Sequence, residues 1–410
     1  MYFYSVMLNI YQNFTQAVTL QNALIKDGRH LLPSDLSIIK NAAIVFDDNN
    51  ILWVGESSKI PSQYSNSPTQ NFSGKIILPE IIDCHTHLVF GGDRANEYTM
   101  RLNGASYEEI ANAGGGIVNT MKQTRLMSRQ KLFEMACTRV NTLASYGVGT
   151  IEIKSGYGLN FEKEYELSMI IHELKQKFKG KLQIINTFMA AHAIPKEFSC
   201  SSEYISNVVL PLLSKLAPEK ILDAVDIFHE KNYFSTEDVL ALFKLAQQLN
   251  IPCKMHVDEF YDNKGAVLAV QSNAISCDHL LMTGDDGVAA LARSSTVACL
   301  LPGTGFFLGK PQAPARKFLD AGVRVAIGSD YNPGSCHCDN VLLIASLAAP
   351  QYKMNQAELF AAITLNAAHA LGIKNQGALV PGLRPRFSIF NTTQLDNLTY
   401  HWGKNFFECH

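Results

Sequence analysis

From about residue 76 onward, the sequence alternates between short apolar stretches and longer segments with helical periodicity. Helical crossovers of this length join parallel strands, so the alternation predicts an α/β fold built on a parallel sheet. About eight such strands fall within roughly 300 residues, which suits a (β/α)8 TIM barrel. A doubly wound open sheet is the alternative. The expected barrel strands lie at residues 76–83, 149–154, 182–189, 224–228, 252–257, 274–277, 296–301 and 323–328.

The two ends of the chain have a different pattern, typical of short strands and turns. An apolar run at 42–46, a turn at 47–50 and a second run at 51–55 indicate a β-hairpin. Another strand is expected at 387–390, after a stretch rich in Pro and Gly. We expect these ends to form a small composite β-sandwich domain. Its two parts would be residues 1–77 and 374–410, and the barrel domain would span 78–373.

Composition excludes several classes of partner. The formal net charge is -2, so the chain has no excess positive charge for nucleic acid or an anionic membrane surface. No apolar run reaches the roughly 18 residues of a membrane helix, and the apolar N-terminus, which lacks basic residues, is interpreted as a first strand. The nine Cys have irregular spacing, which predicts reduced thiols and a cytoplasmic location. The cluster Cys336-His337-Cys338 lacks zinc-ribbon spacing and is interpreted as a loop.

Candidate metal ligands lie at the expected strand ends. His85 and His87 are two residues apart, so their side chains share one face of a strand, although such a pair alone is a weak signal. His256 and Asp330 end two other expected strands. The carboxyl ends of barrel strands carry the active site, so these residues would meet there. Three imidazoles and a carboxylate suit zinc or iron, with an open position for water.

Further candidates are polar residues that lie near these ligands in the sequence or end other strands. Glu259 could move protons, although a solvated Glu at a helix start is common. His279 and His192 also end strands, and His279 could act as a base or could be satisfied by the backbone. Arg94 follows two glycines and could clamp a carboxylate, and Tyr157 lies between two glycines. Both could equally belong to ordinary loops.

Six stretches together resemble the imidazolonepropionase family of the metal-dependent amidohydrolase superfamily. They are 85–92 (HTHLVFGG), 152–158 (EIKSGYG), 256–259 (HVDE), 278–280 (DHL), 301–304 (LPGT) and 329–335 (SDYNPGS). The resemblance runs from about Asn9 to His401. It implies hydrolysis of the ring amide of 4-imidazolone-5-propanoate to N-formimidoyl-L-glutamate, in histidine degradation.

The resemblance also implies roles for individual residues. Its metal ligands would be His85, His87, His256 and Asp330. Its substrate contacts would be Arg94 on the propionate, with Tyr107, Tyr157, His192, Glu259, Asn332, Gly334 and Ser335. Glu259 and His279 would share the acid and base work. One Zn²⁺ or iron ion per subunit is expected, because we find no strand-end Lys that matches the bridging carbamylated Lys of binuclear relatives. A homodimer is expected, since symmetric dimers are the commonest assembly.

The sequence departs from the family pattern at three places. Pro79-Glu80 replaces a usual Pro-Gly, Cys336-His337-Cys338 is unusual in its loop, and residues 383–387 replace a usual Ala-Asp. These departures affect the edge of the small domain rather than the ligands. Two other functions stay open: another cyclic-amide hydrolase or nucleobase deaminase of this superfamily, and an inactive relative that binds a ligand.

Overall fold

The computed structural model describes residues 8–105, 109–110 and 113–408. Its larger sheet has eight parallel strands in the order of the chain, and the bridge between Thr86 and Tyr331 joins the two outer strands at their ends. This closed ring confirms the TIM barrel and excludes the doubly wound alternative. The strands are β6 (Ile81–Asp83), β7 (Val148–Lys154), β8 (Gln183–Ala191), β9 (Ala224–His229), β10 (Cys253–Val257), β11 (Ser276–His279), β12 (Val297–Leu300) and β13 (Val325–Ile327).

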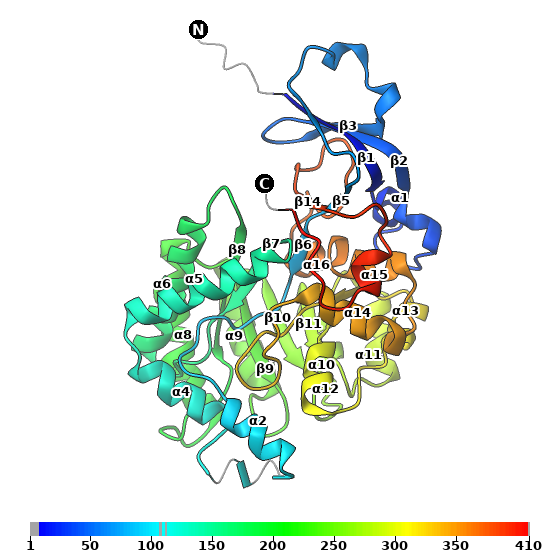
Figure 1. The fold of residues 1–410 in the computed structure, drawn as a ribbon. Coiled ribbons are helices and arrows are strands. Elements are labelled where there is room, and N and C mark those ends of the chain that lie inside the picture. Colours follow the sequence, from blue (N-terminus) through cyan, green and yellow to red (C-terminus); the bar gives the residue numbers. More distant parts are fainter. Residues whose placement is uncertain (1–7, 106–108, 111–112, 409–410) are drawn as a thin grey trace.

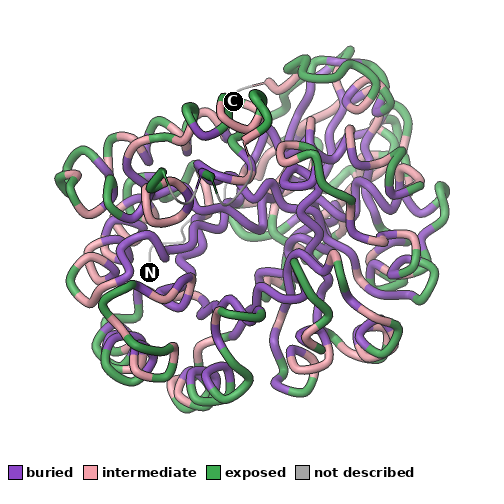
Figure 2. The backbone as a smooth tube through the Cα atoms, turned by 90° about the horizontal axis from the view of Figure 1, so that it is seen from below, coloured by how far each residue is buried: buried purple, intermediate pink, exposed green. Residues whose placement is uncertain are grey.

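Helices surround the barrel, and buried segments gather inside while exposed ones follow the outer rim (Figure 2). The longer ones begin at side-chain caps: Ser128 for α5, Asn160 for α6 and Ser235, as expected, for α9. The helices following β6 to β10 are α2 (Ala95–Leu102), α4 (Ile117–Leu126), α5 (Arg129–Ser145), α6 (Phe161–Lys177), α7 (Ser201–Tyr204), α8 (Leu210–Leu216), α9 (Thr236–Gln248) and α10 (Gly265–Gln271). Those further along the chain are α11 (Asp285–Ala292), α12 (Pro302–Leu308), α13 (Ala315–Asp320), α14 (Val341–Tyr352), α15 (Gln356–Ala362), α16 (Leu365–Ala370) and α17 (Asn397–Tyr400).

One expected helix begins outside the described residues, and another is divided in two. The helix expected from Tyr107 falls at its start on residues outside the described part of the chain, and α2 precedes it. The helix expected at 202–216 is divided by a π-helical turn, Ile205–Val209. Pro211 lies two residues beyond this turn, and its ring nitrogen has no hydrogen to donate to the preceding turn. A regular α-helical ladder is therefore interrupted at this point.

The small sheet combines both ends of the chain. Its strand order is β14-β5-β1-β2-β3, and β4 pairs with β1. The expected hairpin is β2 with β3, while the expected first strand is β1, which begins at Asn9; residues 1–7 lie outside the described part. The strands are β1 (Asn9–Val18), β2 (Ile38–Phe46), β3 (Ile51–Glu56), β4 (Thr69–Asn71), β5 (Ile76–Pro79) and β14 (Phe387–Phe390), and a short helix, α1 (Gln21–Ile25), follows β1. Figure 1 places this sheet at one end of the barrel and α2 at the other.

The expected strand 76–83 is in fact two strands in two sheets. Strand β5 pairs with β14 in the small sheet, and β6 pairs with β7 in the barrel. Glu80, at the junction, is 3% exposed and accepts a hydrogen bond from Arg386 Nε at 2.7 Å. Thr150 Oγ1 and Gln376 Nε2 donate to the other carboxylate oxygen. Glu80 and Arg386, which lie in two of the stretches that depart from the family pattern, therefore form an ion pair.

We propose the division 1–77, 78–373 and 374–410. The pairing of Leu78 and Pro79 with β14 extends the small sheet two residues past the first of these boundaries, to the crossing at Glu80. In the described residues no helix is long and apolar enough to span a bilayer.

Candidate metal centre and substrate cavity

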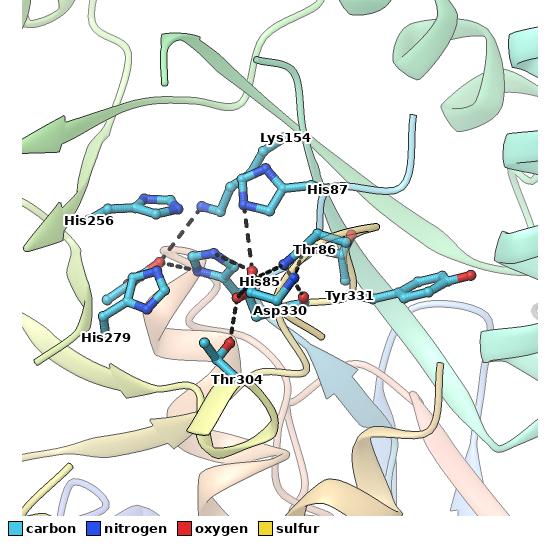
Figure 3. A network of polar contacts seen from close by, with 12 residues as sticks. His85, Thr86, His87, Lys154, His256, His279, Thr304, Asp330 and Tyr331 are labelled. Carbon is cyan, nitrogen blue, oxygen red and sulfur yellow. Dashed lines mark hydrogen bonds and ion pairs between the residues drawn. The ribbon is translucent and has the colours of Figure 1, made fainter. Parts of the chain in front are cut away.

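The four expected ligands meet at the carboxyl end of the barrel (Figure 3). His85 Nε2 lies 3.6 Å from Asp330 Oδ1, and His87 Nε2 lies 3.7 Å from the same oxygen. The His256 ring centroid is 4.5 Å from that of His85. In a tetrahedral site with bonds of about 2.0–2.2 Å, ligand atoms are roughly 3.3–3.6 Å apart. The spacing of the atoms of His85, His87 and Asp330 therefore fits a single cation, with the His256 ring beside them.

The hydrogen bonds of two of the His rings fix which nitrogen could bind that cation. His85 Nδ1 is 2.6 Å from Asp278 Oδ2, and His256 Nδ1 is 3.1 Å from Asp226 Oδ1. A carboxylate accepts, so each Nδ1 carries the hydrogen and each Nε2 has a lone pair. Both Nε2 atoms are buried and lack a hydrogen-bond partner among the described residues. A buried acceptor without a partner is costly, and a divalent metal would supply the partner.

Burial also keeps these rings neutral, as metal ligands must be. It lowers the pKa of His85 well below its usual value, and the charge of Lys154 acts in the same direction. Burial lowers the pKa of His256 to about 3, although the carboxylate of Asp226 opposes the change. Neutral imidazoles with buried lone pairs are suited to bind a cation.

Asp330 is held by its own loop. Its backbone is left-handed, with φ of 52°, a conformation that is uncommon outside glycine and often found at functional sites. Thr304 Oγ1 donates to Asp330 Oδ2 at 2.7 Å, so Oδ1 is the oxygen that faces His85 and His87. Asn332 Nδ2 donates to the Asp330 carbonyl and to Ser335 Oγ, each at 2.7 Å. Thr304, from α12, thus fixes the carboxylate, and the loop fixes the backbone that carries it.

A buried network of charges lies beneath the ligands. Lys154 Nζ is 2.6 Å from Asp226 Oδ2 and 2.9 Å from Glu152 Oε2. Lys254 Nζ is also 2.9 Å from Glu152 Oε2, and 3.8 Å from Asp278 Oδ2. All five side chains have no exposed surface. The carboxylates that orient His85 and His256 are therefore themselves held by two ammonium groups, and we call these five residues the charged floor.

The charged floor corrects one expectation from the sequence. A Lys does end a barrel strand, since Lys154 is the last residue of β7. Burial opposes its charge, but Asp226, Glu152 and Asp278 raise its pKa well above the usual value. A carbamate forms on a neutral amine, so this ammonium is a counter-charge and not a bridging ligand. One metal remains the simpler expectation.

A cavity of about 310 Å³ opens beside the ligands. Except for Tyr107, which lies outside the described residues, every residue expected to contact substrate or move protons lines it. These residues are Arg94, Tyr157, His192, Glu259, His279, Asn332, Gly334 and Ser335. His87, His256 and Asp330 form its inner wall, while His85 lies deeper and is fully buried.

One side of the cavity presents His192 and Tyr157. His192 Nδ1 donates to the Gly156 carbonyl at 3.1 Å, so Nε2 is an acceptor, and burial lowers the pKa of this ring to about 4. The ring stacks on His87 with centroids 4.8 Å apart. Gly156 has φ of 119°, and a Cβ there would lie 2.7 Å from the Met189 carbonyl. Burial raises the pKa of Tyr157, which keeps its hydroxyl neutral.

Glu259 and His279 lie together at the cavity wall, with Oε2 and Nε2 3.7 Å apart. His279 ends β11 in a left-handed conformation, and its Nδ1 is buried without a hydrogen-bond partner among the described residues. Burial raises the pKa of Glu259, while the charge of His279 lowers it. A carboxyl and an imidazole at this spacing can exchange a proton through a small rearrangement or one water.

Arg94 reaches the cavity across Gly334. A Cβ at position 334 would lie 1.8 Å from Arg94 Nη1, so a larger residue here would displace the guanidinium from its present position. Asn332 lines the cavity, but its amide is used inside the loop: Oδ1 accepts from the backbone nitrogens of Gly334 and Ser335. Asn332 therefore holds the wall that Gly334 forms, which the sequence alone did not indicate.

Sequence reasoning missed two groups of residues. The first is the charged floor, whose signal was present: Lys154, Asp226, Lys254 and Asp278 are charges inside or at the ends of otherwise apolar strands. Such residues are rarely buried unless paired. The second group lies on the cavity wall and gave no clear signal; it includes Glu97, Arg101, Phe228, Phe260 and Lys310. The unusual Cys336-His337-Cys338 stretch belongs to neither group: Cys336 is buried and His337 is exposed.

The comparisons with known proteins agree with this architecture. The profile of the amidohydrolase family matches residues 76–406. The chain is 40% identical over 370 residues to the imidazolonepropionase of Paracoccus denitrificans (strain Pd 1222), covering 90% of this chain and 92% of that protein. It is 41% identical over 374 residues to that of Agrobacterium fabrum, with 90% and 89% covered. The chain belongs to the imidazolonepropionase family within the amidohydrolases.

Solved structures with low sequence identity share the fold. Atrazine chlorohydrolase from Arthrobacter aurescens, solved as a zinc complex, has a TM-score of 0.72 at 16% identity, with 93% of this chain and 87% of that chain covered. Guanine deaminase from C. acetobutylicum has a TM-score of 0.66 at 16% identity, with 93% and 90% covered. At this identity the likeness supports the barrel and its small sheet, not a substrate.

Proposed function

We propose that the chain hydrolyses the ring amide of 4-imidazolone-5-propanoate to N-formimidoyl-L-glutamate, as an imidazolonepropionase. The observation that carries this proposal is the pairing of two features in one cavity. A set of buried, neutral imidazoles and a carboxylate converges on its inner wall, and an arginine enters it across Gly334. For a cyclic amide that carries a carboxylate, the ligand set would serve hydrolysis of the amide and the arginine would bind the carboxylate.

His85, His87, His256 and Asp330 would hold one divalent cation, which we propose to be zinc or iron, since both accept these ligands. When bound, such a cation supplies Lewis acidity to the ring carbonyl and to the attacking water. Asp278 and Asp226 keep the His85 and His256 rings in the tautomer that leaves Nε2 available. Burial raises the pKa of Asp278 to about 6, but Lys154 and Lys254 favour the ionised form of both carboxylates.

The proton transfers fall to Glu259 and His279. Hydrolysis removes a proton from water and delivers one to the ring nitrogen that leaves the acyl carbon. Both side chains reach the cavity from the wall beside His256, and their facing atoms, 3.7 Å apart, can exchange a proton through one water or a small rearrangement. Positioned acid and base groups typically contribute about 10²- to 10⁴-fold to a rate.

The other cavity residues would position the substrate. Arg94 would bind the propionate, because a guanidinium pairs with a carboxylate through two hydrogen bonds. His192 Nε2 is an acceptor suited to a ring N–H, and the neutral hydroxyl of Tyr157 can donate. Gly334 and Ser335, held by Asn332, would form the wall on the other side.

The decisive experiment is an assay with metal analysis on the same purified sample. We expect loss of the imidazolone absorbance and one equivalent of zinc or iron per chain. Hydantoins and purine or pyrimidine bases are assayed in parallel. Turnover of a base without turnover of imidazolonepropanoate would favour a deaminase. A metal-free, inactive protein that still binds imidazolonepropanoate would favour the ligand-binding relative.

We further propose a cytoplasmic enzyme that acts as a homodimer on a small molecule, without nucleic-acid or membrane partners. The net charge of -2 supports the last part, because binding to polyanions relies on excess positive charge. Light scattering of the purified protein, with and without salt, tests the dimer.

A further inference from the structure

Three charged residues share one face of α2, the helix at the barrel end away from the small sheet (Figure 1). Arg94 is the N-cap, Glu97 follows three residues later and Arg101 four residues after that. Positions three and four apart lie side by side on a helix. All three residues line the cavity. Arg94 and Arg101 therefore flank Glu97 on the surface that meets the substrate.

Glu97 fixes the position of Arg94. Its side chain is 8% exposed, and its Oε2 accepts from Arg94 Nε at 2.8 Å and from the Gly116 nitrogen at 3.1 Å. Oε1 accepts from Asn119 Nδ2 at 3.1 Å. Because Glu97 binds the Nε edge, the guanidinium presents its Nη1 beside Gly334. The same contact neutralises the Arg94 charge before any substrate arrives.

Arg101 carries the positive charge that this pair lacks. Its guanidinium carbon lies 5.2 Å from the centre of the Phe307 ring and 5.8 Å from that of Tyr98, so two aromatic side chains hold it. Burial lowers its pKa, the charge of Arg94 acts in the same direction, and Glu97 opposes both. These influences identify Arg94 and Glu97 as its electrostatic neighbours.

We infer that Arg101 is a second cation for the substrate carboxylate, and that Glu97 is the positioning residue that keeps Arg94 beside it. Arg94, Glu97 and Arg101 together carry a net charge of +1, which balances one carboxylate. Glu259 and Lys310, which also line the cavity, carry opposite charges of their own. This inference rests on the proposed function, since it assigns the carboxylate of that substrate to a pair of arginines.

The test compares Arg101→Met with Arg101→Lys, on imidazolonepropanoate and on its uncharged propanamide analogue. We expect Arg101→Met to raise KM for the acid by about 10- to 100-fold, the worth of one hydrogen bond to a charged group, with kcat changed less than about threefold. Arg101→Lys should restore much of the loss, because it keeps the charge. The amide should show little change with either variant. Lys122→Met, which removes an exposed charge from α4, is the matched control.

Glu97→Gln tests the positioning role separately. It should raise KM for the acid, and combining it with Arg94→Met should add little, because both changes remove the same oriented guanidinium. If Arg101→Met raises KM for acid and amide equally, or for neither, the second cation is refuted. If Glu97→Gln and Arg94→Met add fully, the positioning role is refuted. A wild-type protein inactive on imidazolonepropanoate would instead refute the proposed function. Thermal unfolding of each variant confirms that it is folded.

Discussion

The charged floor differs from the residues above it in whether its buried polar atoms have partners. We call those upper residues, His85, His87, His256 and Asp330, the ligand layer. In the floor, Lys154, Lys254 and Glu152 are buried, and each is engaged in ion pairs. In the layer above, the Nε2 atoms of His85 and His256 are equally buried but lack hydrogen-bond partners among the described residues. Since the side chains of both regions are buried, burial alone does not explain the difference. It marks the upper layer as built for a ligand.

The comparison also explains why the floor carries two ammonium groups. Buried carboxylates are unstable without nearby positive charge, and Asp226 and Asp278 must stay ionised to orient the rings above them. Lys154 reaches Asp226 directly and lies 3.7 Å from Asp278 Oδ2. The carboxylates of the floor therefore have ammonium partners of their own, whereas the buried Nε2 atoms of His85 and His256 have no hydrogen-bond partner among the described residues.

Removing one ligand should have the largest effect on activity. We expect His256→Ala to lower kcat/KM by at least about 10³-fold and to abolish stoichiometric metal binding, because the cation loses one of its four ligands. Metal analysis and circular dichroism check the two parts. His172→Ala on α6 is the matched control and should behave as wild type. A His256→Ala protein with normal turnover would contradict the ligand assignment.

Breaking the floor should instead reduce stability. Lys154→Met leaves Asp226 and Glu152 short of a buried counter-charge, a change that typically costs about 3–5 kcal/mol of unfolding free energy. Urea denaturation measures it. Lys175→Met removes a cation from an ion pair with Asp223 that is about one-third exposed, and should cost less than about 1 kcal/mol. Equal losses of unfolding free energy in the two variants would contradict the prediction that the buried ion pairs of the floor contribute more to stability than a partly exposed pair.

Weakening the link between floor and ligands should affect metal affinity. Asp278→Asn keeps the shape of the side chain but weakens the hydrogen bond to His85 Nδ1. We expect about 10- to 100-fold weaker metal binding, measured by competition with a chelator. Asp286→Asn, an exposed change on α11, is the control. Unchanged resistance to the chelator would show that the His85 ring is oriented by other contacts.

The smallest effect is expected for a substitution at the junction of the two sheets, outside both the charged floor and the ligand layer. Glu80→Gln removes the charge that pairs with Arg386, and Arg386, which is 23% exposed, can turn toward water. A loss of about 1–2 kcal/mol in unfolding free energy is expected, with kcat unchanged. Glu56→Gln breaks the exposed pair with Lys59 and should have almost no effect. A change in kcat for Glu80→Gln would reveal coupling from the small sheet to the cavity.

Much of this site was predictable because the ligands end strands. Once the alternation predicted a barrel, the ends of β6, β10 and β13 had to meet at one face, and His85, His256 and Asp330 followed. The orienting contacts were not predictable. His85 and Asp278 are 193 positions apart, and strand periodicity does not say which side chains meet across a barrel. The use of Asn332 inside its loop likewise depends on backbone geometry that no spacing reveals.

The boundary between the two sheets was also hidden. Residues 76–83 form one apolar run, and the run does not show that its halves pair with different partners. The change of sheet occurs at Glu80, where a charge enters an otherwise apolar stretch. The departures at 80 and 386 were visible separately, but their contact was not, because it depends on how the last strand returns.

That return has a consequence for how the protein is made. Strand β5 lies between β1 and β14, and Ser388 Oγ accepts from the Ile81 nitrogen across 307 positions of the chain. During synthesis, β5 cannot pair with β14 until nearly the whole polypeptide has emerged from the ribosome. The segment that leads into His85 would then be among the latest to be secured during synthesis. Nascent chains stalled before residue 387 should accordingly be more sensitive to proteases near residue 80 than the released protein.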